Sequence, residues 1–184
     1  SLMKIIIIII SLLLFVKSHA DETFIDVLKE NGKLIFIRHA YAPGNGDPGN
    51  FLLSDCTTQR NLNDEGIQES INIGIFFKKN NVEIDKVLSS EWCRCKDTAN
   101  YAFKKFESQS FLNSFYNKKF KHTKSKQIKD LKKYIKNWKS EKNLVFVTHY
   151  VVILEVLNLS AMPAEIIISD KNFNVLARQK FTNN

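Results

Sequence analysis

Three short apolar runs along the chain are each followed at once by polar or charged residues. The runs are residues 34–37, 87–88 and 144–147, and the residues that follow them are Arg38-His39, Ser89-Ser90 and Thr148-His149. Short, continuously apolar runs rich in β-branched residues are typical of strands buried on both faces, as in a parallel sheet. The pattern therefore predicts central strands that are directly followed by polar or charged residues.

Apolar positions at helical spacing predict four helices between and after these strands. The first begins at Asn63 with acidic residues in its first turn and carries Ile67, Ile71, Ile75 and Phe76. The second is capped by Ser89 or Ser90 and runs through Thr98, Tyr101 and Ala102. The third carries Ile128, Leu131, Ile135 and Trp138, and the fourth begins at Tyr150.

Two apolar segments near the end of the chain, Glu165–Ser169 and residues 175–181, flank a polar stretch as the strands of a hairpin do. Strands that alternate with helices predict a three-layer α/β/α fold, with a mostly parallel central sheet and an antiparallel edge hairpin. No internal repeat or linker divides residues 21–184, so we expect a single domain there.

Residues 1–20 have the layout of a secretory signal peptide. A basic start at Met3-Lys4 precedes twelve mostly apolar residues, and Ser18 and Ala20 form a small-x-small exit before Asp21. A membrane span needs about 20 apolar residues, so an uncleaved anchor is the alternative rather than the expectation. We interpret Ser1-Leu2 as a cloning remnant and expect a periplasmic or secreted protein that starts at Asp21.

The 184 residues are 44% hydrophobic and 25% charged, which excludes collagen-like and wholly disordered chains. The net charge is +8, and eleven lysines lie from Lys118 to Lys142, where we expect them to line the outer face of the third helix. These lysines form either a solvated face or a face that is weakly attracted to an anionic membrane or lipopolysaccharide surface. Tyr134 and Trp138 do not interleave with them as a base-stacking platform would, so we expect no nucleic-acid partner.

Export favours pairing of cysteines. Cys93 and Cys95 flank Arg94 too closely to bridge easily, so we expect Cys56 to pair with Cys93 or Cys95. A Cys-x-Cys pair without a second ligand pair falls short of a zinc pattern, and we expect no metal.

Candidate chemistry gathers where the predicted strands end, because ligands of such sheets bind beyond the carboxyl ends of the strands. His39 and His149 each follow a buried strand, Arg38 precedes His39, and Arg94 lies in the first turn of a helix. Two guanidiniums match the oxygens of a phosphoryl group in geometry and charge. A neutral imidazole can attack phosphorus and form a covalent intermediate.

Four segments, in order, carry a family resemblance. Arg38-His39-Ala40 resembles the Arg-His-Gly signature of the histidine phosphatase (phosphoglycerate mutase-like) superfamily, and residues 61–69, 89–99 and 147–149 resemble its other motifs. Residues 42–48 and 55–61 are similar to those of a small exported bacterial branch. The resemblance implies that His39 becomes phosphorylated, while Arg38, Arg94 and His149 hold the phosphoryl oxygens.

The resemblance further implies that Asn45 contacts substrate, and Arg60 is a candidate to border the pocket. It requires no metal and no cofactor, and it implies a phosphorylated small molecule or envelope component as substrate. Specificity is expected to lie in the loops at residues 41–58 and 108–123.

The sequence departs from the family pattern in three places. Ala40 replaces a glycine, Ser114 stands where mutase-type members carry a glutamate, and Tyr150 follows His149 where acid phosphatases carry an aspartate. Mutase activity is therefore not expected, and the general acid is unassigned. The candidates for it are Asp47, Asp55 and Glu91. Without a strong acid, good leaving groups such as phosphohistidine, acyl phosphate or aryl phosphate should react best.

Three functions remain open from these residues. The first is an exported phosphatase without a metal, the second is a non-catalytic phosphate-binding module, and the third is an envelope-surface interaction protein that uses the lysines. Trapping of phosphate on His39 separates the first from the second.

Overall fold

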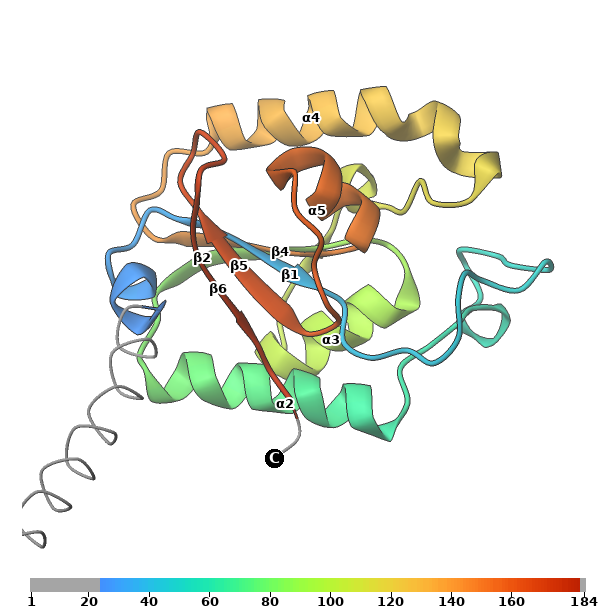
Figure 1. Cartoon of the computed structure of the whole chain (residues 1–184), viewed down its shortest axis with the longest axis horizontal. Helices are drawn as coiled ribbons and strands as arrows, with labels where there is room; N and C mark the ends of the chain where they lie inside the picture. The colour runs from blue at the N-terminus through green and yellow to red at the C-terminus, as the bar shows by residue number, and fades with distance from the viewer. Residues whose placement is uncertain (1–23, 183–184) are drawn as a thin grey trace, which may run out of the picture.

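The computed structural model describes residues 24–182, in which a central sheet lies between two layers of helices (Figure 1). The predicted signal peptide and the expected start at Asp21 lie outside the described residues. Among the described residues, no helix combines the length and apolar character needed to cross a membrane.

The sheet has six strands in the order β3-β2-β4-β1-β5-β6. They are β1 (Leu34–Arg38), β2 (Ile84–Ser89), β3 (Glu107–Ser108), β4 (Asn143–Thr148), β5 (Glu165–Ser169) and β6 (Val175–Lys180). The four strands from β3 to β1 are parallel, whereas β5 runs antiparallel to both β1 and β6. The predicted fold class, with its three layers, mostly parallel sheet and edge hairpin, is therefore confirmed.

Alternating side chains of the central strands enter opposite layers, which explains why the runs are apolar throughout. Leu34 and Phe36 of β1 pack in the core cluster that also contains Leu131 and Ile135, whereas Ile35 and Ile37 pack in the cluster on the other face. These four residues of β1 are fully buried. Strands with no solvent face carry no polar alternation.

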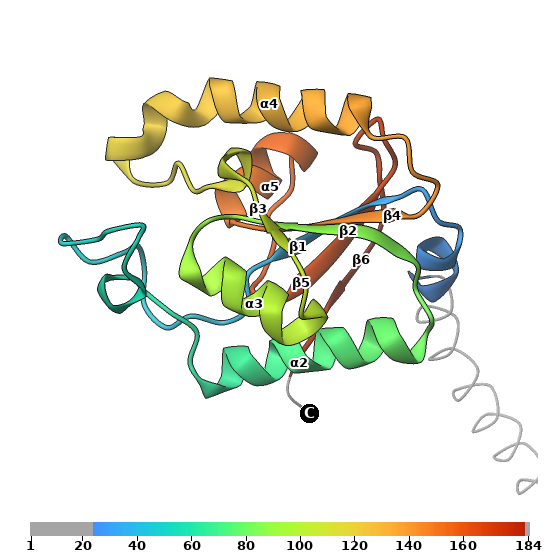
Figure 2. The same cartoon turned by 180° about the vertical axis from the view of Figure 1, so that it is seen from behind.

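Helices cover both faces of the sheet. They include α2 (Asp64–Lys79), α3 (Cys93–Phe103), α4 (Lys124–Asn137) and α5 (Tyr150–Leu157), and residues 24–29 are helical as well. Figures 1 and 2 show α4 and α5 on one face, and α2 and α3 on the other. Short 3-10 helices lie at Cys56–Thr58, Ser110–Leu112 and Lys118–Thr123.

The side that α2 buries differs from the predicted stripe. Ile73 and Phe77 are buried, whereas Ile75 is 56% exposed. Apolar residues surround most of this helix, so spacing alone does not identify its inner side. Close packing on α3 decides it, because the α-carbon of Gly74 faces the backbone of Ala102.

The start of α3 also differs from the prediction. Trp92 is the N-cap and makes no side-chain capping hydrogen bond, so neither Ser89 nor Ser90 caps the helix. The N–H of Cys93 instead donates to Gln59 Oε1 at 2.9 Å, an acceptor from a distant loop. A tertiary contact thus replaces the local cap that the sequence suggests.

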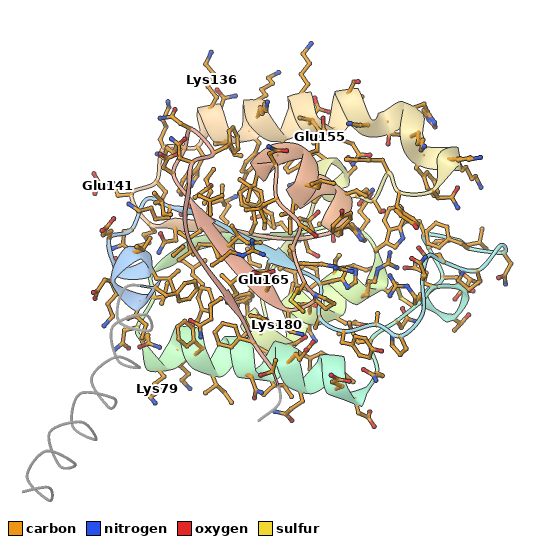
Figure 3. All side chains as sticks on the ribbon, viewed as in Figure 1. Lys79, Lys136, Glu141, Glu155, Glu165 and Lys180 are labelled. Carbon is orange, nitrogen blue, oxygen red and sulfur yellow. A yellow bond between two sulfur atoms is a disulfide. The ribbon has the colours of Figure 1, made fainter. Side chains whose placement is uncertain are left out.

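The lysine-rich stretch is not one helix. Its first part is the 3-10 helix Lys118–Thr123, and α4 ends at Asn137. Trp138 is the C-cap of α4, and its buried indole donates to Asp85 Oδ2 at 2.8 Å. Figure 3 shows Lys136 projecting from the outer face of α4.

We predict that Gly74→Ala destabilises the protein because a Cβ there would lie 2.3 Å from the carbonyl oxygen of Ala102. Crowding in a packed core costs about 1–3 kcal/mol, and here a backbone atom is in the way. Urea unfolding measures the loss. Gly49→Ala is the matched control, since its Cβ would meet nothing within 4 Å; equal stability of the two variants would contradict the prediction.

Candidate active site

The pairing of β1 with β4 places the two candidate histidines side by side. Arg38 is in register with Thr148, and the N–H of His39 donates to the Thr148 carbonyl at 2.9 Å. The rings of His39 and His149 are 5.5 Å apart between centroids. Ala40, which follows His39 in place of the family glycine, has no positive φ, so alanine fits there without strain.

Hydrogen bonds assign the tautomer of His39. Its Nδ1 lies 2.9 Å from the carbonyl oxygen of Ala40, which only accepts, so Nδ1 carries the proton. Its Nε2 therefore carries a lone pair, and this nitrogen accepts from Arg94 Nε at 3.2 Å. The unprotonated nitrogen of His39 thus lies beside a guanidinium.

Arg94 links His39 to the carboxylate of Asp47. Its Nη1 and Nη2 donate to the two oxygens of Asp47 at 2.8 and 3.3 Å. The side chains of Arg94 and Asp47 are only 4% and 15% exposed. Asp47 also accepts from the indole of Trp92 at 3.1 Å and from the backbone N–H of Arg60 at 3.1 Å. These bonds hold the guanidinium with its Nε edge toward His39.

Asp47 is the one carboxylate among the described residues that line this pocket. Burial alone would raise its pKa, but the hydrogen bond and charge of Arg94 outweigh burial and lower the pKa overall. Asp55 bonds to Thr57 instead, and Glu91 accepts from Asn113 at 2.6 Å. None of the three candidate acids is therefore placed in the pocket as a protonated carboxyl.

The remaining predicted side chains border the same pocket, a cavity of about 230 Å³. Arg38 donates to the Ala161 carbonyl at 2.7 Å, while its buried Nε has no hydrogen-bond partner among the described residues. Arg60 bonds to the carbonyls of Gly46 and Ala42, and Asn45 lies 3.5 Å from the Tyr116 hydroxyl. The structure thus brings together Arg38, His39, Asn45, Arg60, Arg94 and His149.

His149 is bound on one side by small polar groups. Its Nε2 lies 2.8 Å from Ser90 Oγ and 3.5 Å from Cys95 Sγ. Burial first, and then the charge of Arg94, lower the pKa of both His39 and His149 well below the usual 6.5. Both imidazoles are therefore neutral near pH 7, and burial rather than the arginines is the larger cause.

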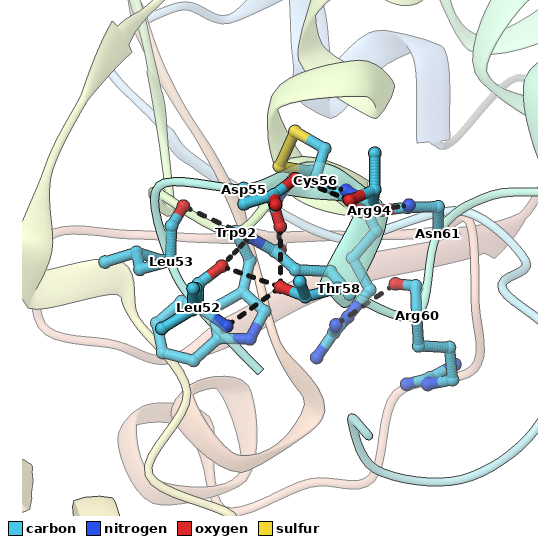
Figure 4. The surroundings of a disulfide bond; sticks show 12 residues. Leu52, Leu53, Asp55, Cys56, Thr58, Arg60, Asn61, Trp92 and Arg94 are labelled. Atoms are coloured by element: carbon cyan, nitrogen blue, oxygen red, sulfur yellow. Dashed lines mark hydrogen bonds between the residues drawn. A yellow bond between two sulfur atoms is a disulfide. The ribbon is translucent and has the colours of Figure 1, made fainter. Parts of the chain in front are cut away.

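A disulfide ties the loop that carries Asp47 and Arg60 to the start of α3. Cys56 and Cys93 are bonded, with 5.7 Å between their α-carbons, and Figure 4 shows the bridge beside Arg94 and Trp92. Of the two pairings predicted for Cys56, the structure has this one. Cys95 is a free buried thiol, and burial raises its pKa to about 12, so it is protonated. Within residues 24–182, no three His, Cys, Asp or Glu side chains gather as a metal site would require.

Sequence reasoning missed an aromatic wall of the pocket. It consists of Phe51, Trp92, Tyr116 and Phe120. Apart from Trp92, these residues lie within residues 41–58 and 108–123, the loops expected to hold specificity. No spacing or motif distinguishes the aromatic residues of these loops from the other Phe and Tyr residues of the chain.

Solved structures with the same architecture establish a phosphoglycerate mutase-like fold. Phosphoglycerate mutase from Thermus thermophilus matches with a TM-score of 0.58 and 14% identity, over 83% of this chain and 99% of that chain. TTHB049 from the same organism matches with a TM-score of 0.56 and 15% identity, over 81% and 99% of the two chains. The Rv3214 open reading frame product of Mycobacterium tuberculosis matches with a TM-score of 0.56 and 18% identity, over 83% and 97%. No protein-family model and no curated protein matches the sequence.

We predict that the disulfide contributes about 3–4 kcal/mol to the free energy of unfolding, by closing a loop between residues 37 apart in sequence. The double variant Cys56→Ser, Cys93→Ser should lose this amount in urea unfolding without reductant. Cys95→Ser is the matched control, because Cys95 is outside the bridge. An unchanged midpoint of the double variant would contradict the prediction.

We predict that stability falls as the pH drops below about 6.5. There the unfolded chain takes up protons on His39 and His149, whose lowered pKa values keep them unprotonated in the folded protein. Thermal unfolding between pH 8 and 5.5 measures the slope. His149→Asn should flatten it, whereas replacement of the exposed His122 by Asn should not; equal slopes would contradict the assignment.

Proposed function

We propose that this protein is an exported phosphatase that hydrolyses phosphomonoesters through a phosphohistidine on His39 and needs no metal. The observation that carries the proposal is the state of His39: a neutral imidazole whose Nε2 lone pair lies beside Arg94. A nucleophilic nitrogen must carry a free lone pair. A cation beside it can also stabilise the negative charge that develops on the phosphoryl oxygens during the attack.

The charges around His39 suit a phosphoryl group. Among the described residues, four cationic side chains and a single carboxylate line the pocket: Arg38, Arg60, Arg94, Lys119 and Asp47. The buried Nε of Arg38 lacks a partner within this part of the chain, and a buried donor left unsatisfied is costly. The Arg38 side chain also borders the pocket, where its charge would pair with an anion.

The reaction has two displacements at phosphorus. The lone pair of His39 Nε2 forms a bond to phosphorus, while the bond to the leaving oxygen breaks and that oxygen departs with its electron pair. Water then attacks the phosphohistidine, the P–N bond breaks, and its electrons return to Nε2. The proton of the water passes to solvent, and inorganic phosphate leaves. Arg94 and Arg38 stabilise the charge on the transferred oxygens in both steps.

The export part of the proposal rests on two features. Residues 3–20 have the signal-peptide layout, and Cys56 and Cys93 form a disulfide. Disulfides persist in the periplasm and outside the cell, whereas cytoplasmic thiols are kept reduced.

A non-catalytic phosphate-binding module is the second candidate. The observation in its favour is that the pocket's carboxylate bonds to Arg94 and is ionised, so no carboxyl group among the described lining residues is ready to protonate a leaving group. Such a module would bind phosphate in the same pocket without forming a bond to His39.

We predict that His39→Ala abolishes turnover and that Arg94→Ala lowers it by about 10²-fold or more, the cost of a lost charge-stabilising donor. Wild-type protein is mixed with a ³²P-labelled phosphate monoester, without added metal, and quenched without acid. Peptide mapping should then locate acid-labile label on His39.

His122→Ala is the matched control, because His122 is exposed and does not line the pocket. His39→Asn repeats the test with a polar replacement of similar size. Turnover that persists in both His39 variants, or that appears only with divalent metal, would refute the phosphohistidine mechanism. Phosphate binding without label or turnover would favour the binding module.

A further inference from the structure

The pocket has two unlike ends. Its inner end carries the histidines and arginines at the carboxyl edge of the sheet. Two loops supply much of its remaining lining, including the aromatic residues Phe51 from one loop and Tyr116 and Phe120 from the other. A substrate whose phosphoryl group reaches His39 therefore places its leaving group against aromatic rings.

Contacts among the rings hold this wall in place. Phe51 stacks on Trp92, with centroids 5.1 Å apart and planes 18° apart. Phe120 meets both rings edge-on, at 5.9 Å from Phe51 and 5.6 Å from Trp92. Trp92 in turn lies edge-on to His149 at 5.4 Å. The wall is thus continuous from the loops to the catalytic end, and an aromatic ring gains from offset or edge-to-face packing there.

Besides its ring contacts, Trp92 is fixed by burial and by a hydrogen bond. It is 3% exposed, and its indole donates to Asp47, the partner of Arg94. The aromatic wall and the catalytic arginine therefore share one support.

The carboxylate of the pocket also favours an aryl leaving group. Asp47 is the pocket's carboxylate, and both of its oxygens bond to the guanidinium of Arg94. A leaving oxygen must then depart without a proton from a carboxyl group. A phenol ionises near pKa 10, whereas the pKa of an alcohol, like that of water, is far higher, so an aryl oxygen leaves more readily as its anion.

We propose that the substrates are aryl phosphates, with a single flat ring that packs against the wall formed by Phe51, Tyr116 and Phe120. This rests on the proposed phosphatase function and specifies its substrate class. The cavity of about 230 Å³ is smaller than the roughly 300 Å³ and upward of pockets for drug-sized ligands, which fits a phosphoryl group and one ring.

Binding is tested with two compounds that no phosphatase can hydrolyse by P–O cleavage, phenylphosphonate and methylphosphonate. Calorimetry should show phenylphosphonate binding at least about 10-fold more tightly, as an added ring contact implies. Phe120→Ala should remove most of this preference, measured as the ratio of the two dissociation constants. Phe120→Leu, which keeps apolar bulk, should retain the fold and lose part of the preference.

Tyr101→Ala is the matched control, because Tyr101 is a half-buried aromatic on α3 outside the pocket lining. Equal binding of the two phosphonates to the wild-type protein would overturn the proposal. So would a ring preference that Phe120→Ala leaves intact.

Turnover separates this proposal from the one on which it rests. Phenyl phosphate should be hydrolysed faster than glycerol phosphate. Acetyl phosphate, which has a good leaving group but no ring, should show a higher KM than phenyl phosphate. A ring preference in binding with no turnover and no label on His39 would refute the phosphatase and keep the aryl site. Turnover with equal KM for acetyl and phenyl phosphate would refute the aryl site and keep the phosphatase.

Discussion

The buried guanidinium of Arg94 is the group on which the site depends. A charge removed from water is costly unless it is paired and hydrogen-bonded. Arg94 meets this requirement with Asp47 on one edge and His39 on the other. The pairing joins three separate segments, because His39 follows β1, Arg94 belongs to α3, and Asp47 lies in the loop between β1 and α2. The position of Arg94 beside His39 thus depends on its ion pair with Asp47.

The disulfide and the aromatic contacts keep that arrangement in place. Cys93 is the neighbour of Arg94, and its bond to Cys56 anchors the loop that brings Asp47. Trp92, which precedes Cys93, donates to Asp47 and stacks with Phe51. Charge, covalent link and apolar packing therefore act on the same stretch of α3. Support of this kind from surrounding groups holds the side chains of a pocket in one geometry.

Burial has a second consequence, which is chemical. It removes water from both imidazoles and, together with Arg94, keeps them neutral. The same closed environment strengthens the interaction between the arginines and an incoming anion. It also raises the pKa of Cys95 to about 12, so the thiol beside His149 is held inert. One physical cause thus keeps the His39 imidazole neutral and the Cys95 thiol protonated.

The sequence by itself determined the layers of the fold and the residues at the strand ends. Continuous apolar runs mark strands without a solvent face, and parallel pairing then forces Arg38, His39 and His149 to one edge. Only the tertiary structure decided the partner of Cys56, the inner side of α2, the start of α3, the role of Asp47 and the aromatic wall. Each of these depends on contacts between residues far apart in the chain, such as Gln59 with Cys93 or Phe51 with Trp92. Local periodicity predicts the type of an element and, where only one side is apolar, its buried side, but it carries no information about which loop residues meet across space.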